Sequence, residues 1–389
     1  MPWPISSHST SAYYEVVVIG GGPAGAAAAI ALRRKGATVA IVERTHYEDI
    51  RVGETLPGTV VRPLAQLGLW EDFLAAGHEP APGLTVLWGG TTPHDNDFIF
   101  SPCGSGWHVN RTEFDRMLAT SAEQSGTEVY CSMRIDSCDP EGGGWRISIR
   151  DRTSRLSLNA RWLVDATGRS GWLARHLGIR RGVLDKLVSL VAFGKRSDKC
   201  WPQTIVESCH HGWWYAATLP HSRTVVSFFT DSDLLPPSGG EREKFWHESL
   251  QRTRRVSGVA GTIDETEPLR VVAATSTKLD HAAGPNWLAI GDANQSHDPL
   301  SGHGVVKALR SGIGGADAIF ASSRGDRSAI DRFVKESARE FERYLTQRAR
   351  FYSREERWPQ ATFWSRHRRL EALTHYVPRQ SRKFLISAK

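Results

Sequence analysis

Apolar and polar positions near the start of the chain follow the pattern of a strand, a turn, a helix and a second strand. Residues 16–19 form a short apolar run, residues 24–34 are rich in helix formers, and residues 38–42 form a second apolar run. The sequence GGGPAG separates the first run from the helical segment. This order predicts a βαβ unit at the beginning of a parallel sheet of the Rossmann type.

A second pattern occupies the middle of the chain, where apolar runs rich in β-branched and aromatic residues alternate with short polar segments. These runs predict an antiparallel sheet over residues 187–194, 204–208, 212–219 and 224–229. Because side chains alternate along a strand, Trp213 and Tyr215 should share one face and Trp214 the other. One face could line an aromatic pocket, or all three side chains could fill the sheet core.

The remaining segments are a turn-rich break and a helical end. Residues 231–243 are rich in proline, glycine and charge, which predicts a surface loop. After residue 326 the apolar positions recur with a helical period, which places on one face Phe333, Ala338, Phe341, Tyr344 and Leu345.

The net charge of +7 is concentrated at one end of the chain. Residues 348–389 hold 11 Lys and Arg against 3 acids, which leaves 38 bases and 39 acids in the rest. No nucleic-acid-binding motif accompanies this excess, so nucleic acid is not an expected partner. The basic end is either a solvated helical tail or a contact surface for an acidic protein or an anionic lipid surface.

The cysteines and the N-terminal residues bear on the compartment. Five cysteines without a CxxC pair support neither a disulfide framework nor a zinc site, and no metal site is predicted. The first residues lack a secretory signal pattern, and the apolar stretch over residues 14–32 is broken by the glycine turn. We therefore expect a cytoplasmic protein without an integral membrane segment.

The glycine turn carries the most specific motif of the chain. Gly20, Gly22 and Gly25 have the G-x-G-x-x-G spacing, in which the backbone approaches a pyrophosphate at a helix N-terminus. Glu43 ends the second strand, where an acid can bind a ribose. The predicted dinucleotide site also includes the adjoining Pro23, Ala24 and Arg44.

Two later segments extend this motif. The first, RWLVDATGRSGWLARHLG, contains Asp165 and Gly168; the second, NWLAIGDANQSHDPLSGHGVVKALRSG, contains a G-D pair and a P-x-x-G-x-G loop. Together with the glycine turn they resemble the FAD-binding motifs of the p-hydroxybenzoate hydroxylase-like superfamily. That superfamily includes aromatic monooxygenases, flavin-dependent halogenases and geranylgeranyl reductases, so the resemblance implies FAD as cofactor.

The resemblance also implies an architecture. It is an α/β fold with a glutathione reductase-like FAD-binding domain of the Rossmann type, an antiparallel β-sheet substrate domain and a helical C-terminal region. The FAD-binding domain would be discontinuous, over residues 14–85, 105–175 and 270–325. The substrate domain would comprise residues 86–104 and 176–269, and the helical region residues 326–389.

Roles for individual residues follow from the resemblance. Asp292, after Gly291, would contact the ribityl chain, and the isoalloxazine ring would lie along the loop of Pro299, Gly302 and Gly304. Arg111 resembles an arginine that caps the cofactor, and Glu54 belongs to a G-E-x-x-P segment shared by halogenases and their neighbours. Relatives often read Gly-Asp-Ala-Ala-His where this chain reads Gly-Asp-Ala-Asn-Gln, so a histidine role at that place does not carry over.

A missing lysine bears on the branch of the superfamily to which the chain is assigned. Halogenases carry a lysine roughly two dozen residues after G-E-x-x-P, but this chain has none between Lys35 and Lys186, and reads His78-Glu79 there. The halogenase Trp-x-Trp-x-Ile-Pro signature is also imperfect. The segments RVGETLPG, GSGWHVNRTEFDRML and HGWWYAATLP instead look similar to flavoprotein maturases of cysteine tryptophylquinone enzymes. That similarity implies hydroxylation of a tryptophan side chain in a precursor protein.

Candidates for the chemistry lie next to the flavin loop and in the aromatic run. They are His297, Asp298, Trp213 and Trp214, with His108, Glu54, His210 and His211 as weaker acid–base candidates. The electron donor would be NAD(P)H or a partner flavin reductase. Alternatives are a small-molecule aromatic hydroxylase or halogenase-like enzyme, a flavin-dependent isoprenoid reductase, and a binding protein with a structural flavin.

Overall fold

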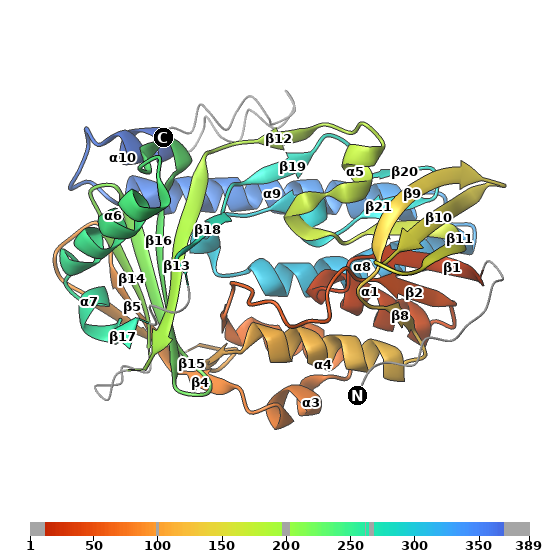
Figure 1. The fold of residues 1–389 in the computed structure, drawn as a ribbon, viewed down its shortest axis with the longest axis horizontal. Coiled ribbons are helices and arrows are strands. Elements are labelled where there is room, and N and C mark those ends of the chain that lie inside the picture. Colours follow the sequence, from red (N-terminus) through yellow and green to blue (C-terminus); the bar gives the residue numbers. More distant parts are fainter. Residues whose placement is uncertain (1–11, 99–100, 197–202, 261, 264–267, 369–389) are drawn as a thin grey trace.

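Two large β-sheets stand next to each other, with helices packed around both (Figure 1). The computed structural model describes residues 12–98, 101–196, 203–260, 262–263 and 268–368. The long helix α9 (Ala329–Ser353) runs across both halves of the molecule, so the C-terminal region connects the two sheets (Figure 1).

The first sheet has a parallel centre. Its parallel strands, in spatial order, are β8 (Glu128–Tyr130), β2 (Val39–Val42), β1 (Ala12–Ile19), β11 (Arg155–Asp165) and β21 (Trp287–Ala289). The antiparallel strands β20 (Ala283–Gly284), β10 (Gly144–Arg150) and β9 (Arg134–Glu141) extend it. Ile19 lies opposite both Val42 and Asp165, so three carboxyl ends meet at the glycine turn. Parallel α/β sheets bind ligands at this edge.

Helices α1 (Pro23–Arg34) and α8 (Gly304–Ser323) pack tightly against each other beside this sheet. At Gly312 an added Cβ would lie 2.3 Å from the carbonyl oxygen of Ala24, and at Gly291 it would lie 2.8 Å from the Ala24 Cβ. Gly312 in α8 and Ala24 in α1 therefore allow the two helices to approach closely. Helix α4 (Arg111–Gln124) also packs on α1.

The second sheet forms most of the other half. Its strands, in spatial order, are β17 (Thr262–Ile263), β13 (Leu187–Lys195), β16 (Arg223–Asp231), β15 (Gly212–Leu219), β14 (Thr204–Cys209), β5 (Gly83–Leu87) and β6 (His94–Asp97), with β18 (Arg270–Ala273) also paired to β13. The pairing is antiparallel except between β14 and β5. The four strands expected from the sequence are confirmed as β13 to β16. Strands β5 and β18 also belong to this sheet. Their residues 83–85 and 270–273 lie outside the limits given above for the substrate domain.

Helices α6 (Gly239–Gln251) and α7 (Val256–Val259) pack on this sheet. The prediction of a loop over residues 231–243 is wrong from Gly239 onward, because α6 begins there. The Ser238 hydroxyl accepts a hydrogen bond from the backbone N–H of Glu241, and the Glu241 carboxylate accepts one from the backbone N–H of Ser238. This reciprocal cap satisfies N–H groups that would otherwise lack partners at the helix start.

Short elements connect the halves. A three-stranded sheet of β3 (Thr55–Leu56), β7 (Gly106–His108) and β4 (Glu79–Ala81) lies near β15, and a second is formed by β12 (Arg181–Val183), β19 (Thr277–Leu279) and β22 (Gln295–Ser296). The remaining short helices are α2 (Val61–Gln66), α3 (Trp70–Ala75), α5 (Trp172–His176) and α10 (Thr362–His367). Residues 329–367 thus confirm the helical C-terminal region, while residues 369–389 lie outside the described residues.

The adjacent tryptophans of β15 point to opposite faces of the sheet, as their alternation predicts. Trp213 is 1% exposed and stacks on Phe229 with ring centroids 3.8 Å apart, on the face covered by the C-terminal helices. Trp214 is fully buried on the other face, between Phe228 and Trp246 of α6. Both indoles are therefore packed among other aromatic rings.

Replacing Trp214 with alanine should destabilise the fold without emptying the cofactor site. Truncation of a buried aromatic side chain costs about 3–5 kcal/mol of unfolding free energy. Urea denaturation of Trp214→Ala should show this loss, Trp214→Phe a much smaller one, and folded Trp214→Ala should keep its flavin. Unchanged stability combined with lost turnover would instead give Trp214 a direct role in the chemistry.

Candidate functional site

The three glycines of the G-x-G-x-x-G motif, at the end of β1 and the start of α1, are needed for different structural reasons. Gly20 has a φ of +100°, and an added Cβ would lie 2.5 Å from the carbonyl oxygen of Ala166. At Gly25 a Cβ would lie 1.9 Å from the carbonyl oxygen of Gly20. At Gly22, however, the nearest atom to an added Cβ is a guanidinium nitrogen of Arg51, 3.7 Å away. The fold itself requires the first two glycines, while Gly22 leaves open space in front of the helix.

That space lies at the N-terminus of α1, which starts at Pro23. No side chain caps this end, so its first backbone N–H groups remain available to an anion. Ala24 is buried against α8 and contributes through packing. The open position at Gly22 and the uncapped amides fit a dinucleotide pyrophosphate.

Glu43 lies directly beside the turn. Its side chain is buried and accepts hydrogen bonds from the backbone N–H of Gly21 at 2.8 Å and from the Thr45 hydroxyl at 2.8 Å. Arg51 approaches the same carboxylate at 3.6 Å. Glu43 is therefore held rigidly at the end of β2, where a ribose-binding acid is expected. Arg44 follows it and is exposed.

Arg111 begins α4 and braces the loop before Glu54. Its guanidinium pairs with the buried Asp115 at 3.1 Å and donates to the carbonyl oxygen of Val52. Asp115 also pairs with Arg51 at 3.4 Å. Through Asp115 and Arg51, the expected cofactor-capping arginine is therefore connected to Glu43 beside the glycine turn.

Asp165 is committed to its own loop. Its carboxylate accepts hydrogen bonds from the Thr167 hydroxyl at 2.6 Å, from the backbone N–H of Thr167 and from the N–H groups of Leu173 and Ala174 in α5. Gly168, with a φ of +64°, forms the turn between them. These contacts thus fix the loop between the end of β11 and the start of α5.

Asp292 is held by cations that the sequence did not reveal. Lys307, buried in α8, donates to its carboxylate at 2.7 Å and also to the carbonyl oxygen of Gln295, and Arg169 lies 3.7 Å away. Burial raises the pKa of Asp292. The positive charges of Lys307, Arg169 and Arg181 outweigh this effect, so the pKa of Asp292 lies below its ordinary value. Asp292 is a charged acceptor whose side chain stays 31% exposed.

The loop from Pro299 to Gly304 leads into α8. Gly302 has a φ of +64°, and an added Cβ at Gly302 or Gly304 would meet nothing within 4 Å. His303 precedes α8 without a side-chain hydrogen bond to its amides. An uncapped helix end beside open space fits the negative charge of a reduced isoalloxazine ring.

Asp298 anchors this loop to the C-terminal helix. It is 1% exposed, and its carboxylate accepts hydrogen bonds from the backbone N–H of Leu300 at 2.9 Å, from Arg348 at 3.2 Å and from the Tyr352 hydroxyl at 2.8 Å. The Trp213 indole in turn donates to the Tyr352 oxygen at 3.1 Å. Trp213 is thus connected to the loop through Tyr352 rather than by direct contact.

Arg348 continues the network into the second sheet. Besides Asp298 it pairs with Asp185 at 3.3 Å and lies 2.6 Å from Nδ1 of His367. The other ring nitrogen of His367 lies 2.8 Å from Asp231 at the end of β16. All these side chains are almost fully buried, so their charges depend on one another.

His297 stacks flat on Tyr344 of α9, with ring centroids 4.0 Å apart. Its Nε2 has no hydrogen-bond partner among the described residues, and burial holds its pKa well below the ordinary value. A neutral imidazole next to the flavin loop can accept or relay a proton. His210 and His211 lie instead in the turn between β14 and β15.

A buried polar cluster lies where β3 and β7 meet the second sheet. Glu54 is 4% exposed, its Oε1 has no partner among the described residues, and burial raises its pKa. Next to it, the Tyr215 hydroxyl lies 2.6 Å from the Thr55 hydroxyl. His108 contacts the Thr204 hydroxyl at 2.9 Å, and burial lowers its pKa to about 4. The carboxyl of Glu54 and the hydroxyl of Tyr215 therefore lie close together, although Glu54 directly precedes β3 and Tyr215 belongs to β15.

Comparison with known proteins decides the family. Residues 13–368 match the model of the FAD binding domain family. The chain belongs to this family. Its cofactor is FAD, and the protein is an FAD-dependent oxidoreductase. The resemblance to the FAD-dependent monooxygenase and halogenase superfamily is confirmed.

Two curated relatives illustrate the similarity. The protein named "Putative FAD-dependent oxidoreductase LodB" from Marinomonas mediterranea is 31% identical over 344 residues, covering 87% of this chain and 92% of the relative. A brominase of Pseudoalteromonas luteoviolacea that acts on 1H-pyrrole-2-carbonyl peptidyl-carrier protein is 27% identical over 310 residues, covering 76% and 75%.

Solved structures share the fold. The flavin-dependent halogenase CmlS superposes with a TM-score of 0.82 at 24% identity, covering 98% of this chain and 71% of its own. The peptidyl tryptophan dihydroxylase QhpG, essential for tryptophylquinone cofactor biogenesis, has a TM-score of 0.76 at 25% identity, covering 92% and 79%. The flavoprotein fold with a Rossmann-type FAD domain is therefore confirmed.

Two further observations concern metals and membranes. Among the described residues, no three His, Cys, Asp or Glu side chains are grouped so that they could hold a metal ion. None of the described helices combines the length and the apolar character that crossing a bilayer would require.

Gly22→Val should separate cofactor binding from folding. Gly22 has a φ of −68° and open space around it, so a side chain is tolerated by the protein but projects into the proposed pyrophosphate position. We expect a folded variant with normal circular dichroism that purifies with little FAD, measured by absorbance at the flavin bands. Gly90→Val, at an open position outside the left-handed backbone region, should keep its flavin as a control. A fully yellow Gly22→Val protein would contradict this assignment.

Proposed function

We propose that this protein is an FAD-dependent monooxygenase that hydroxylates the indole of a tryptophan side chain in a precursor protein during quinone cofactor biogenesis. The overall reaction consumes one O₂, one aromatic C–H bond and a two-electron donor such as NAD(P)H with a proton. It yields one C–OH group, water and the oxidised donor. When bound, FAD supplies the oxygen-activating redox chemistry.

Similarity over nearly the whole chain supports this proposal. The LodB relative and QhpG both align over more than four-fifths of this chain, and QhpG is a peptidyl tryptophan dihydroxylase. Halogenases are also among the relatives, so the family alone does not choose between the two reactions.

The observation that favours hydroxylation is the lack of a lysine in the segment where halogenases carry theirs. No lysine occurs from residue 36 to residue 185. His78, in the corresponding segment, is buried against Phe73 and Phe114, and burial lowers its pKa to about 4. Glu79 pairs with Arg196 at 3.2 Å. A neutral histidine and a paired glutamate are poorly suited to hold a hypohalous acid.

Within the site, different residues would bind the cofactor and transfer protons. The turn at Gly22 and the α1 amides would hold the pyrophosphate, Glu43 a ribose, and Asp292 the ribityl chain. The loop that Asp298 anchors would lie along the ring. We assign acid–base chemistry to Glu54, whose buried Oε1 has no partner among the described residues and whose pKa burial raises, and to the neutral imidazole of His297.

The surroundings of the reaction are part of the proposal. The electron donor would be NAD(P)H or a partner flavin reductase, and the substrate partner a tryptophan-containing precursor protein. The four cysteines that the structure describes are all unpaired, which suits the reducing cytoplasm.

Mass spectrometry of the substrate decides between the candidate reactions. The protein, a reduced flavin source and O₂ are mixed in parallel with a tryptophan-containing precursor peptide, free tryptophan or an isoprenoid alkene, each with and without bromide. We expect the peptide to gain one or two oxygen atoms in either buffer. A bromide-dependent gain of bromine would establish halogenation instead, and oxidation of free tryptophan alone would favour a small-molecule hydroxylase. Saturation of an isoprenoid double bond without consumption of O₂ would favour the reductase.

Glu54→Gln should slow turnover while leaving FAD bound. The amide keeps the shape of the buried carboxyl but cannot transfer its proton, and a positioned general acid contributes about a hundredfold or more to rate. Flavin absorbance measures cofactor retention, and product mass measures turnover. The matched control is Glu79→Gln, whose carboxylate is partly exposed and paired with Arg196. Normal turnover in Glu54→Gln would exclude Glu54 as the proton donor.

A further inference from the structure

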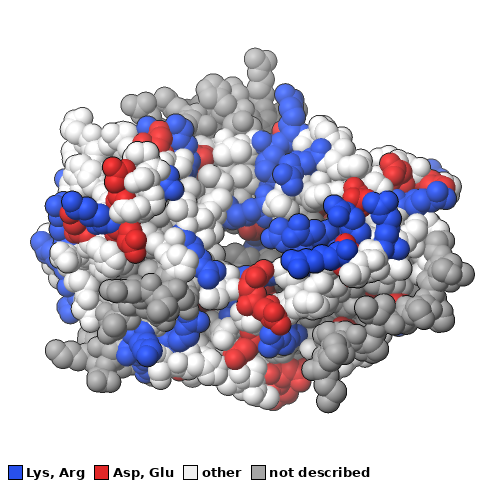
Figure 2. Space-filling view, in the orientation of Figure 1, with Lys and Arg blue, Asp and Glu red and all other residues white. Residues whose placement is uncertain are grey.

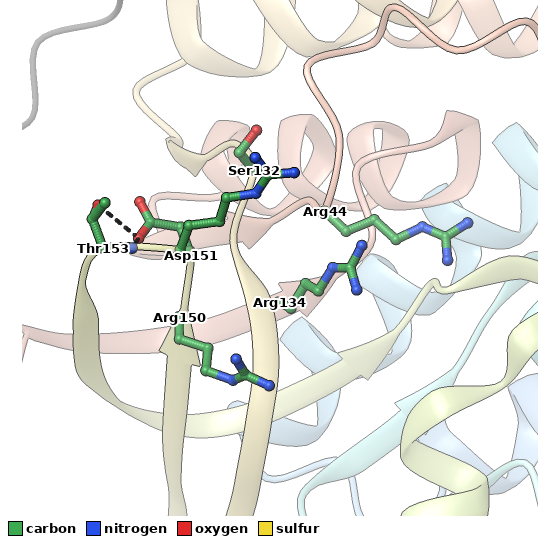
Figure 3. Close-up of a pocket in the computed structure, with 7 residues that line it drawn as sticks. Arg44, Ser132, Arg134, Arg150, Asp151 and Thr153 are labelled. Atoms are coloured by element: carbon green, nitrogen blue, oxygen red, sulfur yellow. Dashed lines mark hydrogen bonds between the residues drawn. The ribbon is translucent and has the colours of Figure 1, made fainter.

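Basic side chains line more than one pocket of this molecule. The pocket drawn in Figure 3 includes Arg44, which directly follows Glu43, so we count it with the proposed FAD site. A different pocket, of about 400 Å³, lies at one end of the second large sheet. Blue side chains occur over both halves of the face in Figure 2, so positive charge alone does not single out a site. The residues that line the pocket of the second sheet are Gly194, Lys195, Arg196, His221, Ser222 and Arg223.

This pocket is built from strand ends and a turn of the second sheet. Lys195 ends β13 and lies directly opposite Arg223, which begins β16. The backbone N–H of Arg196 donates to the carbonyl oxygen of Ser222 at 2.8 Å, which joins the end of β13 to the turn before β16. No residue of the described lining belongs to the parallel sheet, to α1 or to α8. The pocket is thus separate from the glycine turn and the flavin loop.

Two of the basic side chains connect the pocket to neighbouring elements. His221 Nε2 lies 2.9 Å from a carboxylate oxygen of Glu113 in α4, and Arg196 pairs with Glu79 in β4 at 3.2 Å. Figure 1 shows β4 and the start of α4 next to this end of the sheet. Neither glutamate lines the pocket, so its described lining contains basic residues and no acid. Such a lining suits an anionic group.

The turn before β16 is held in an unfavourable backbone conformation. His221 and Ser222 have φ values of +63° and +54°. Glycine and asparagine are the usual residues in this left-handed region, because a Cβ makes it costly. The contact of His221 with Glu113 does not offset this cost, since both side chains are exposed and exposed pairs contribute little to stability. Strained residues concentrate at functional sites, and here both strained residues line the pocket.

The pocket lies near the buried polar cluster that contains Glu54. His108 of this cluster is 3.3 Å from the Thr218 hydroxyl, and Thr218 lies opposite Thr224, directly after Arg223. The electrostatics agree with this position. Burial, the main effect, raises the pKa of Glu54, and the charge of Arg223 is among the effects that act against it. One bound substrate can therefore contact the pocket and reach the cluster.

We propose that this pocket binds an acidic side chain of the precursor protein, close in sequence to the tryptophan that is oxidised. The inference rests on the proposed function, because it needs a protein substrate. Lys195 is exposed and forms no ion pair with a described residue, and the Arg223 guanidinium is held 5.2 Å from the ring centroid of Phe193. A carboxylate between the two cations would accept charge-assisted hydrogen bonds. Its position would select which tryptophan of the precursor reaches the cluster at Glu54.

Peptide binding to the FAD-loaded full chain tests this inference. Two labelled peptides carry the same tryptophan, which is flanked on both sides by glutamate in one peptide and by glutamine in the other. Fluorescence anisotropy at low salt should show a Kd about tenfold lower for the glutamate peptide, with the difference shrinking as salt rises. Equal binding of the two peptides, or binding of neither, would overturn the inference. So would stronger competition by inorganic pyrophosphate than by unlabelled glutamate peptide, which would assign the pocket to phosphate.

Product mass from the same two peptides separates this inference from the proposed function. The peptides are incubated with the protein, a reduced flavin source and O₂. Oxygen gain in both peptides with equal Kd values would leave the hydroxylation standing and overturn the acidic recognition. A lower Kd for the glutamate peptide without oxygen gain in either peptide would keep the recognition and overturn the hydroxylation.

A double variant and a matched control assign the preference to the pocket. Lys195→Gln/Arg223→Gln should reduce the ratio of the two Kd values about tenfold, while flavin absorbance stays normal. The control is Lys244→Gln/Arg252→Gln, which removes the same charge from exposed positions at α6. If the pocket variant does not fold, Lys195→Gln alone replaces it, because that side chain is exposed. An unchanged ratio in the pocket variant, or an equal loss in the control, would overturn the inference.

Discussion

The buried carboxylate of Asp298 is the constraint on which the geometry of the active half depends. A charge that is 1% exposed requires partners, and here these partners come from different elements: Leu300 in its own loop, and Arg348 and Tyr352 in α9. The loop that would carry the flavin ring is therefore positioned by the C-terminal helix. The family match likewise includes α9, since it extends to residue 368.

The same principle operates at the other end of the loop. Lys307 extends back from α8 to Asp292, so the segment from Asp292 to Asp298 has an ion pair at each end. Between them His297 rests on Tyr344. Removing one partner of a buried pair costs about 3–5 kcal/mol, more than a replacement of both partners by apolar groups. The segment is thus held in one conformation by charges that must be satisfied together.

Much of the fold could be predicted because its signals are local. The glycine spacing, the apolar runs that became β13 to β16 and the alternation of Trp213 and Trp214 all depend on neighbours in the sequence. The start of α6 also had a local signal, the S-x-x-E cap at Ser238, which the turn-forming residues around it concealed. The partners of Asp298 and Asp292 had none, because Arg348 and Lys307 meet them only after distant helices pack.

The chemistry of this fold is decided by few side chains, since related proteins with the same architecture halogenate or hydroxylate. A halogenase must keep a cation close to its substrate. In this protein His78 packs in an aromatic cluster and Glu79 pairs with Arg196, while burial raises the pKa of the Glu54 carboxyl. The cation next to that segment is thus already paired with a carboxylate. This environment and the similarity to the tryptophan dihydroxylase QhpG both support the proposed hydroxylation of an indole.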